Sequence, residues 1–180
     1  MKFVLGILLG GLAIHAQSTP RGTATDVTSA EIQAAVKKTA SSAVSDQQLR
    51  VVSIQGEYNV AIGVLHRNRA SAQNPAGALE HSEVTEVYQI VSGNGTFVTG
   101  GTLDNPKASA PDSQIVKVLD GPSTTGGPIR NGVSRKVGPG DMIIIPPNTP
   151  HGFTEIDDQV VYTVVRVDPH KILPAGYTAK

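Results

Sequence analysis

Two imidazoles and one carboxylate occur in sequence settings that suit a metal ion. His81 comes before a short polar turn, residues 82–85, and Glu86 follows that turn at the start of a β-rich run. His151 follows the proline-rich segment 146–150, where one expected strand gives way to the next. Imidazole and carboxylate ligands on rigid strands bind a hard-to-borderline divalent ion and leave coordination positions open. These residues predict one divalent transition metal, without distinguishing Fe, Mn, Zn, Ni and Cu.

Two further residues beside this set could move a proton. Successive side chains of a strand point to opposite faces, so Tyr88 shares a face with Glu86 and is expected to point inward. A phenol close to a metal can donate a proton, or accept one when its pKa is lowered. We therefore take Tyr88 as a candidate catalytic residue, with a hydrogen-bonded core tyrosine as the alternative. Glu83 is the second candidate for proton transfer.

One helix followed by many short strands is expected to position these residues. Thr28 and Glu31 have the spacing of a capping box, which predicts a helix over residues 29–40, and a further turn is suggested near 46–49. After Leu49 the pattern changes to short β-rich runs separated by Gly and Pro, which is typical of a sandwich or closed barrel. The expected strands are 51–54, 58–65, 87–91, 96–99, 115–119, 142–145 and 160–167, with a hairpin at Gly93-Asn94-Gly95.

The stretch from Gly100 to Gly140 is rich in Pro and Gly, and only residues 115–119 within it have a strand pattern. We interpret the remainder as long loops over a barrel mouth or edge, where loops commonly contact substrates. A plain surface insertion is the alternative.

The chain has 180 residues, which suits one domain after removal of a leader. Residues 1–16 have a short positive start, an unbroken apolar run and a small residue at Ala16, which predicts a cleaved secretion signal rather than a membrane anchor. The expected location is secreted or periplasmic, with no membrane association after cleavage.

Composition excludes several classes of function. Lys and Arg together number 15, as do Asp and Glu, and no basic block occurs, so nucleic acid is not expected as a partner. The chain has no Cys, which excludes disulfides, thiolate metal sites and a cysteine nucleophile. A small-molecule ligand is the expected partner.

The segments around the three candidate ligands resemble the two motifs of the cupin superfamily. Glu86 and Gly93 have the spacing of the first motif, with His81 at its second histidine. Gly140, Pro146 and His151 match the second motif. The resemblance covers residues 50–167 and implies an all-β fold, a cupin-type double-stranded β-helix (jelly-roll barrel) with a short N-terminal helix. The implied divisions are a signal over 1–16, a flexible lead and helix over 17–48, a barrel over 49–168 and a tail over 169–180.

The chain departs from the motifs at two positions. Leu79 stands where the first motif has its other histidine, and Asn148 stands where the second motif usually has Gly. Either Glu80 or Glu83 could supply the missing ligand; Glu83 is favoured, since it lies two residues after His81.

The superfamily includes dioxygenases, isomerases, lyases, sugar-binding modules and storage proteins, so the resemblance leaves the reaction open. We expect a metal-dependent lyase, isomerase or dioxygenase acting on a small anionic or chelating substrate. A non-catalytic small-molecule or sugar-binding module is the alternative, and a structural role is a third possibility.

Residues 86–91 are apolar on both faces, and cupins are often dimers, so a homodimer is expected.

For several other residues we favour an interpretation without a role in function. Arg166 shares a strand face with Tyr162 and could hold a substrate carboxylate, but an outward, solvated Arg is the favoured alternative. His66 is expected to be a strand-end residue rather than part of the mouth, Phe153 a core residue, and His170 a surface residue.

Overall fold

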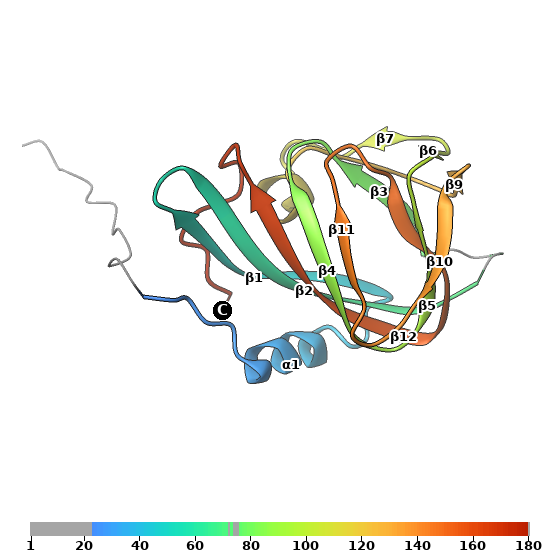
Figure 1. Cartoon of the computed structure of the whole chain (residues 1–180), viewed down its shortest axis with the longest axis horizontal. Coiled ribbons are helices and arrows are strands. Elements are labelled where there is room, and N and C mark those ends of the chain that lie inside the picture. Colours follow the sequence, from blue (N-terminus) through green and yellow to red (C-terminus); the bar gives the residue numbers. More distant parts are fainter. Residues whose placement is uncertain (1–22, 72, 74–75, 180) are drawn as a thin grey trace, which may run out of the picture.

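The structure is a computed structural model that describes residues 23–71, 73 and 76–179 (Figure 1). The expected secretion signal, residues 1–16, lies outside the described residues. No helix within the described ranges is long and apolar enough to cross a membrane.

Twelve strands, one α-helix and one π-helical turn make up the described chain. Their bounds are α1 (Ser29–Lys38), β1 (Val44–Ile54), β2 (Tyr58–Ala70), β3 (Ala78–His81), β4 (Thr85–Ser92), β5 (Gly95–Thr99), β6 (Thr102–Leu103), β7 (Lys107–Ala108), η1 (Ile115–Leu119), β8 (Ser123–Gly126), β9 (Ile129–Arg130), β10 (Val133–Val137), β11 (Met142–Ile145) and β12 (His151–Asp168).

The long strand β12 organises the barrel. Its first half pairs with β3 and β5, and its second half pairs with β2 and β4, all antiparallel. One half of the barrel therefore runs β1–β2–β12–β4–β11, and the other runs β10–β5–β12–β3–β8–β7. Aromatic and branched side chains from both halves, among them Tyr88, Phe97, Phe153 and Tyr162, fill the space between them. The predicted all-β jelly-roll barrel with a short N-terminal helix is confirmed.

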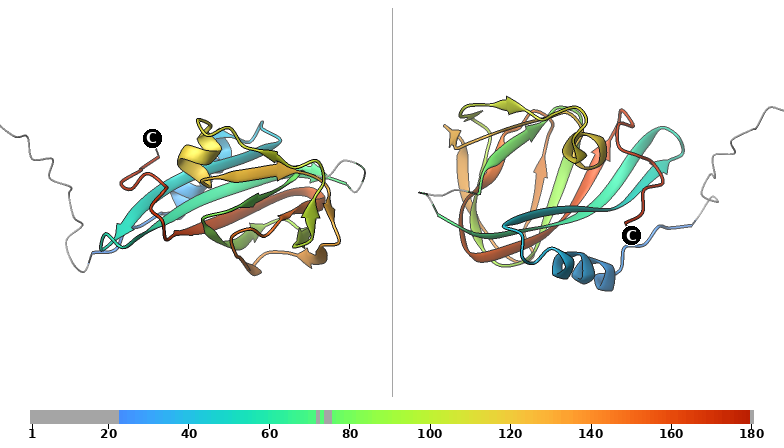
Figure 2. Two further views of the ribbon diagram at one scale, coloured as in Figure 1. Left: turned by 90° about the horizontal axis from the view of Figure 1, so that it is seen from above. Right: turned by 180° about the vertical axis from the view of Figure 1, so that it is seen from behind.

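Helix α1 begins as predicted and covers only part of the barrel. The Thr28 hydroxyl caps the Glu31 amide, and the Glu31 carboxylate accepts from the Thr28 amide. Ile32 and Val36 pack against Leu49 of β1. The helix lies on the outside of the barrel (Figure 1 and Figure 2). The suggested further turn near residues 46–49 is wrong, because these residues pair with β2 as part of β1.

The predicted hairpin is also wrong, although both of its strands form. β4 and β5 do not pair with each other; each runs antiparallel to a different half of β12. Gly93 lies between them with φ +79°, and a Cβ atom there would lie 1.8 Å from the Gln159 carbonyl oxygen. The glycine therefore permits a close passage of the chain across β12, which a short-range turn pattern cannot distinguish from a hairpin.

The segment between Gly100 and Gly140 is more ordered than the expected loops. It contains β6 to β10. The predicted strand at 115–119 is wrong, because these residues form the π-helical turn η1. Its Asp120 amide donates to the Ile115 carbonyl at 2.8 Å. A short apolar run has the same pattern in a strand and in a buried turn of helix.

Replacement of Gly93 by Ala is expected to destabilise the barrel far more than the same change at Gly56. Both glycines have a positive φ, but a Cβ atom at Gly56 meets nothing within 4 Å. Chemical denaturation should show a loss of about 1 kcal/mol for Gly56→Ala, from backbone strain alone, and about 3 kcal/mol or more for Gly93→Ala. Equal losses would contradict the close passage of the chain across β12.

Candidate metal centre

The structure brings together the three residues that the sequence singles out as metal ligands. His81 ends β3, Glu86 lies on β4 and His151 begins β12. Glu86 Oε2 lies 3.1 Å from His81 Nε2 and 3.3 Å from His151 Nε2. The three potential ligand atoms lie within 4.8 Å of one another, and all three side chains are buried. The group could therefore hold a metal ion.

Each imidazole is oriented by a hydrogen bond at its other nitrogen. His151 Nδ1 lies 2.9 Å from the Thr149 carbonyl oxygen, which can only accept. His81 Nδ1 lies 3.1 Å from the Ser123 hydroxyl, whose own hydrogen goes to the Gly121 carbonyl at 2.8 Å. Both Nδ1 atoms therefore carry a hydrogen, so in the neutral rings both Nε2 lone pairs face the carboxylate. Because the lone pairs and the carboxylate repel one another, such a group is favourable only when it holds a cation. That cation can be a proton or a metal ion.

A turn in the second motif supports His81 from the backbone. Asn148 has φ +57° and donates its amide hydrogen to the His81 carbonyl at 2.6 Å. This left-handed conformation explains why Gly is usual at the position and why Asn, which tolerates it, can replace Gly.

Arg166 is the main functional residue that the sequence interpretation missed. The favoured prediction of an outward, solvated arginine is wrong, since only 1% of Arg166 is exposed. Its Nε donates to Glu86 Oε1 at 2.9 Å, opposite the carboxylate oxygen that faces the histidines. Alternation along β12 carried the necessary signal, because Val160, Tyr162 and Val164 on the same face are all buried.

The charges of the centre shift the pKa values of its members. Burial lowers the pKa of His81, but the charges of Glu86 and Asp120, with the hydrogen bond to Glu86, outweigh burial and raise it. Burial raises the pKa of Glu86, but His81, His151 and Arg166 hold it well below its usual range. These shifts favour the ionised form of Glu86, and a metal ion would compete with a proton for His81.

Tyr88 points into the barrel as predicted. Its hydroxyl donates to Glu86 Oε2 at 2.9 Å and lies 3.2 Å from His151 Nε2. Burial, with the charge of Glu86, raises the pKa of Tyr88 well above its usual value. The phenol is therefore a neutral donor rather than a base in this structure.

Neither carboxylate considered for the vacant histidine position joins the group. Glu83, also a candidate for proton transfer, lies at the surface, where its carboxylate is 3.6 Å from Nε2 of His170. Glu80 points to the opposite face of β3 from His81, as neighbours on one strand do. Leu79 lies directly opposite His151 across the β3–β12 pair, so the vacant position is apolar.

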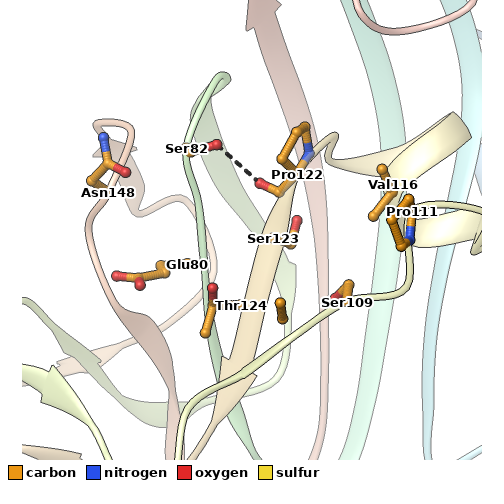
Figure 3. A pocket seen from close by; sticks show the side chains of 10 residues that line it. Glu80, Ser82, Ser109, Pro111, Val116, Pro122, Ser123, Thr124 and Asn148 are labelled. Carbon is orange, nitrogen blue, oxygen red and sulfur yellow. Dashed lines mark hydrogen bonds between the residues drawn. The ribbon is translucent and has the colours of Figure 1, made fainter.

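Glu80 lines a separate pocket of about 290 Å³ beside β3 and β8 (Figure 3). Residues from the 100–140 stretch, among them Ser109, Pro111 and Val116, form its far wall. Ser123 lines this pocket and also holds His81 Nδ1, so one hydroxyl connects the pocket to the candidate metal centre.

The other candidates lie away from the centre. His66 is buried next to the end of α1, where Nε2 lies 2.9 Å from the Ser42 carbonyl oxygen. Phe153 belongs to the core, as predicted, and His170 lies at the surface.

Comparison with known proteins leaves the function open. No protein-family model and no curated protein matches the chain. Similar solved structures include BH2720 from Bacillus halodurans, at 14% identity and TM-score 0.48, covering 89% of this chain and 92% of that one. DMSP lyase DddQ from Ruegeria pomeroyi DSS-3 has 16% identity and TM-score 0.44, and the match covers 76% of this chain and 53% of the lyase. A Klebsiella pneumoniae protein with a double-stranded beta-helix domain has 14% identity and TM-score 0.40, covering 69% and 75%. At these scores the likenesses carry no argument about activity.

Stability of the metal-free protein should fall as the pH rises through 6. Burial raises the pKa of Asp46, a neighbour of Arg166, to about 6; Arg166 opposes the shift and Asp120 adds to it. A carboxyl with a raised folded-state pKa contributes stability that is complete below its unfolded value, about 4, and lost as the pH passes its folded value.

Thermal unfolding at pH 5 and pH 7 should therefore show a drop in the melting temperature, and Asp46→Asn should make it smaller. Glu57→Gln, in the exposed turn between β1 and β2, is the matched control and should leave the drop unchanged. A drop that persists unchanged in Asp46→Asn would contradict this assignment.

Proposed function

We propose that this chain is an exported cupin-type protein that binds one divalent transition metal through His81, Glu86 and His151. We further propose that it acts as a metal-dependent enzyme on a small anionic or chelating substrate. The observation that carries the metal site is the convergence of two Nε2 lone pairs and one carboxylate oxygen in a buried group. Export is supported by the sequence pattern of residues 1–16.

The chemistry of the donor set suggests the class of substrate. Bound there, a divalent ion supplies a Lewis acid that polarises a substrate carbonyl or hydroxyl oxygen. Two neutral imidazoles and one carboxylate leave one positive charge on such an ion, which favours anionic or chelating ligands. Tyr88 is neutral and donates a hydrogen bond at the same point, so it is suited to give a proton to the substrate. Lyase, isomerase and dioxygenase chemistry all use such a site.

Protein purified without an affinity tag should contain close to one equivalent of a divalent transition metal by elemental analysis. His151→Ala should lose at least about nine tenths of it, because two ligands bind far more weakly than three. His170→Ala removes an exposed histidine and is the matched control. Wild-type protein that neither contains a metal nor takes up added Zn²⁺ or Mn²⁺ would contradict the proposal.

Tyr88→Phe should lower kcat by about a hundredfold and leave metal content unchanged, since the phenol is proposed to move a proton rather than to bind the ion. Activity would be sought on a panel of small hydroxy and keto acids, with chelator-reversible turnover as the criterion. Tyr177→Phe is the control. Equal kcat for Tyr88→Phe and wild type would remove Tyr88 from the catalytic set.

The apolar residue at Leu79 favours a second candidate, a non-catalytic module that binds a small molecule or sugar. It leaves three protein ligands instead of four and places an aliphatic side chain opposite His151. Metal binding with ligand binding, and no chelator-reversible turnover on any member of the panel, would favour this alternative over an enzyme.

We also propose that the chain forms a homodimer through the outer face of β4 and β11. Met142 and Ile144 on β11 are 66% and 72% exposed, and Val91 on β4 is 48% exposed. Helix α1 packs elsewhere, against Leu49 and Val64. An apolar sheet face of this kind is typically covered by another surface.

Light scattering should give twice the monomer mass for the wild type and the monomer mass for Ile144→Glu. The exposed position of Ile144 makes this change compatible with a folded monomer, which circular dichroism would check. Ser134→Glu, at an exposed position on β10, is the control. A monomeric wild type at tens of micromolar would contradict the proposal.

A further inference from the structure

The buried guanidinium of Arg166 joins the candidate metal centre to a second group of polar side chains. Besides its bond to Glu86, Arg166 donates through Nη1 to Gln48 Oε1 at 2.9 Å. Its Nη2 contacts the carboxylates of both Asp46 and Asp120, the latter at 2.7 Å. These residues come from β1, from β12 and from the end of η1, and we refer to Arg166, Asp46, Asp120 and Gln48 as the arginine cluster.

The arginine cluster is incompletely satisfied. Within the described ranges, Asp46 Oδ1 and the Gln48 amide nitrogen are buried without a hydrogen-bond partner, and Asp120 Oδ1 has only its ion pair with Arg166 Nη2. One guanidinium thus faces three carboxylates, counting Glu86, which leaves a net charge of −2 when all are ionised. Arg67, the other buried arginine of the described chain, bonds to Tyr162 and Ala76 and not to these carboxylates.

Unbalanced charge inside a barrel is costly, since the interior solvates ions poorly. Among the described residues, His81, Glu86 and His151 form the one group of ligand atoms that could hold a compensating cation. Two positive charges there balance the net charge of −2, whereas one positive charge leaves half of it uncompensated.

We infer that the arginine cluster sets the strength and charge preference of cation binding at His81, Glu86 and His151. The inference rests on the proposed metal site. Arg166 acts as a positioning residue, because it occupies Glu86 Oε1 and leaves Oε2 for the cation. Asp46 and Asp120 supply the negative charge that makes the interior favour a divalent ion. None of the four belongs to the group of potential metal ligands.

Two isosteric substitutions with opposite changes of charge test this inference. Asp46→Asn removes one negative charge from the cluster, and Gln48→Glu adds one while replacing an amide nitrogen that has no partner. A unit change of charge this close to a divalent ion in a poorly solvating interior changes its affinity by about tenfold. Titration with Zn²⁺ at pH 8, above the pKa of about 6 of Asp46, should give weaker binding for Asp46→Asn and tighter binding for Gln48→Glu.

The double variant Asp46→Asn/Gln48→Glu restores the net charge and should therefore bind Zn²⁺ within about threefold of the wild type. Glu57→Gln, which removes an exposed charge, is the control and should bind as the wild type does. Asp120→Asn replaces Asp46→Asn if the latter fails to fold.

The outcomes separate this inference from the proposed function. Absence of Zn²⁺ binding in the wild type would overturn both. Binding in the wild type, with both single variants weakened alike or with no rescue in the double variant, would overturn the inference and leave the metal site standing. Opposite shifts with rescue would support it, because a purely structural role predicts damage from either change.

Discussion

The carboxylate of Glu86 is the group around which this protein is organised. It is almost completely buried, and such a charge persists only with strong compensation. Arg166 compensates one oxygen, while the two imidazoles and the Tyr88 hydroxyl surround the other. The lone pairs of the two imidazoles therefore meet at this second oxygen, Oε2. A proton or a metal ion is expected to bind at that point.

One long strand, β12, carries two of the residues that contact this carboxylate. β12 carries His151 at its start and Arg166 near its end, and β4, which carries Glu86, pairs with its second half. Bending of β12 brings both ends to the same interior, where His151 and Arg166 approach Glu86 from different sides. Because the chain can pass close to β12 at Gly93, β4 and β5 can both pair with that strand.

Local pattern was sufficient for much of this arrangement. Alternation placed Tyr88 with Glu86, motif spacing selected His81 and His151, and the capping residues located α1. The failures came where the outcome depends on distant residues. Arg166 points inward because it forms ion pairs there with Asp46 and Asp120. These two residues lie 120 and 46 positions away from it in the sequence. Strand signals at residues 115–119 and the apparent hairpin at Gly93 failed because a short run does not specify its pairing partner.

Glu86 Oε2, His81 Nε2 and His151 Nε2 are proposed to share one divalent ion. A crystal of the protein soaked in Zn²⁺, with anomalous diffraction data collected above and below the zinc edge, would show whether they do. One strong anomalous peak is expected in the interior, about 2.0–2.2 Å from each of these three atoms. No interior peak, or a peak bound through other atoms, would contradict it.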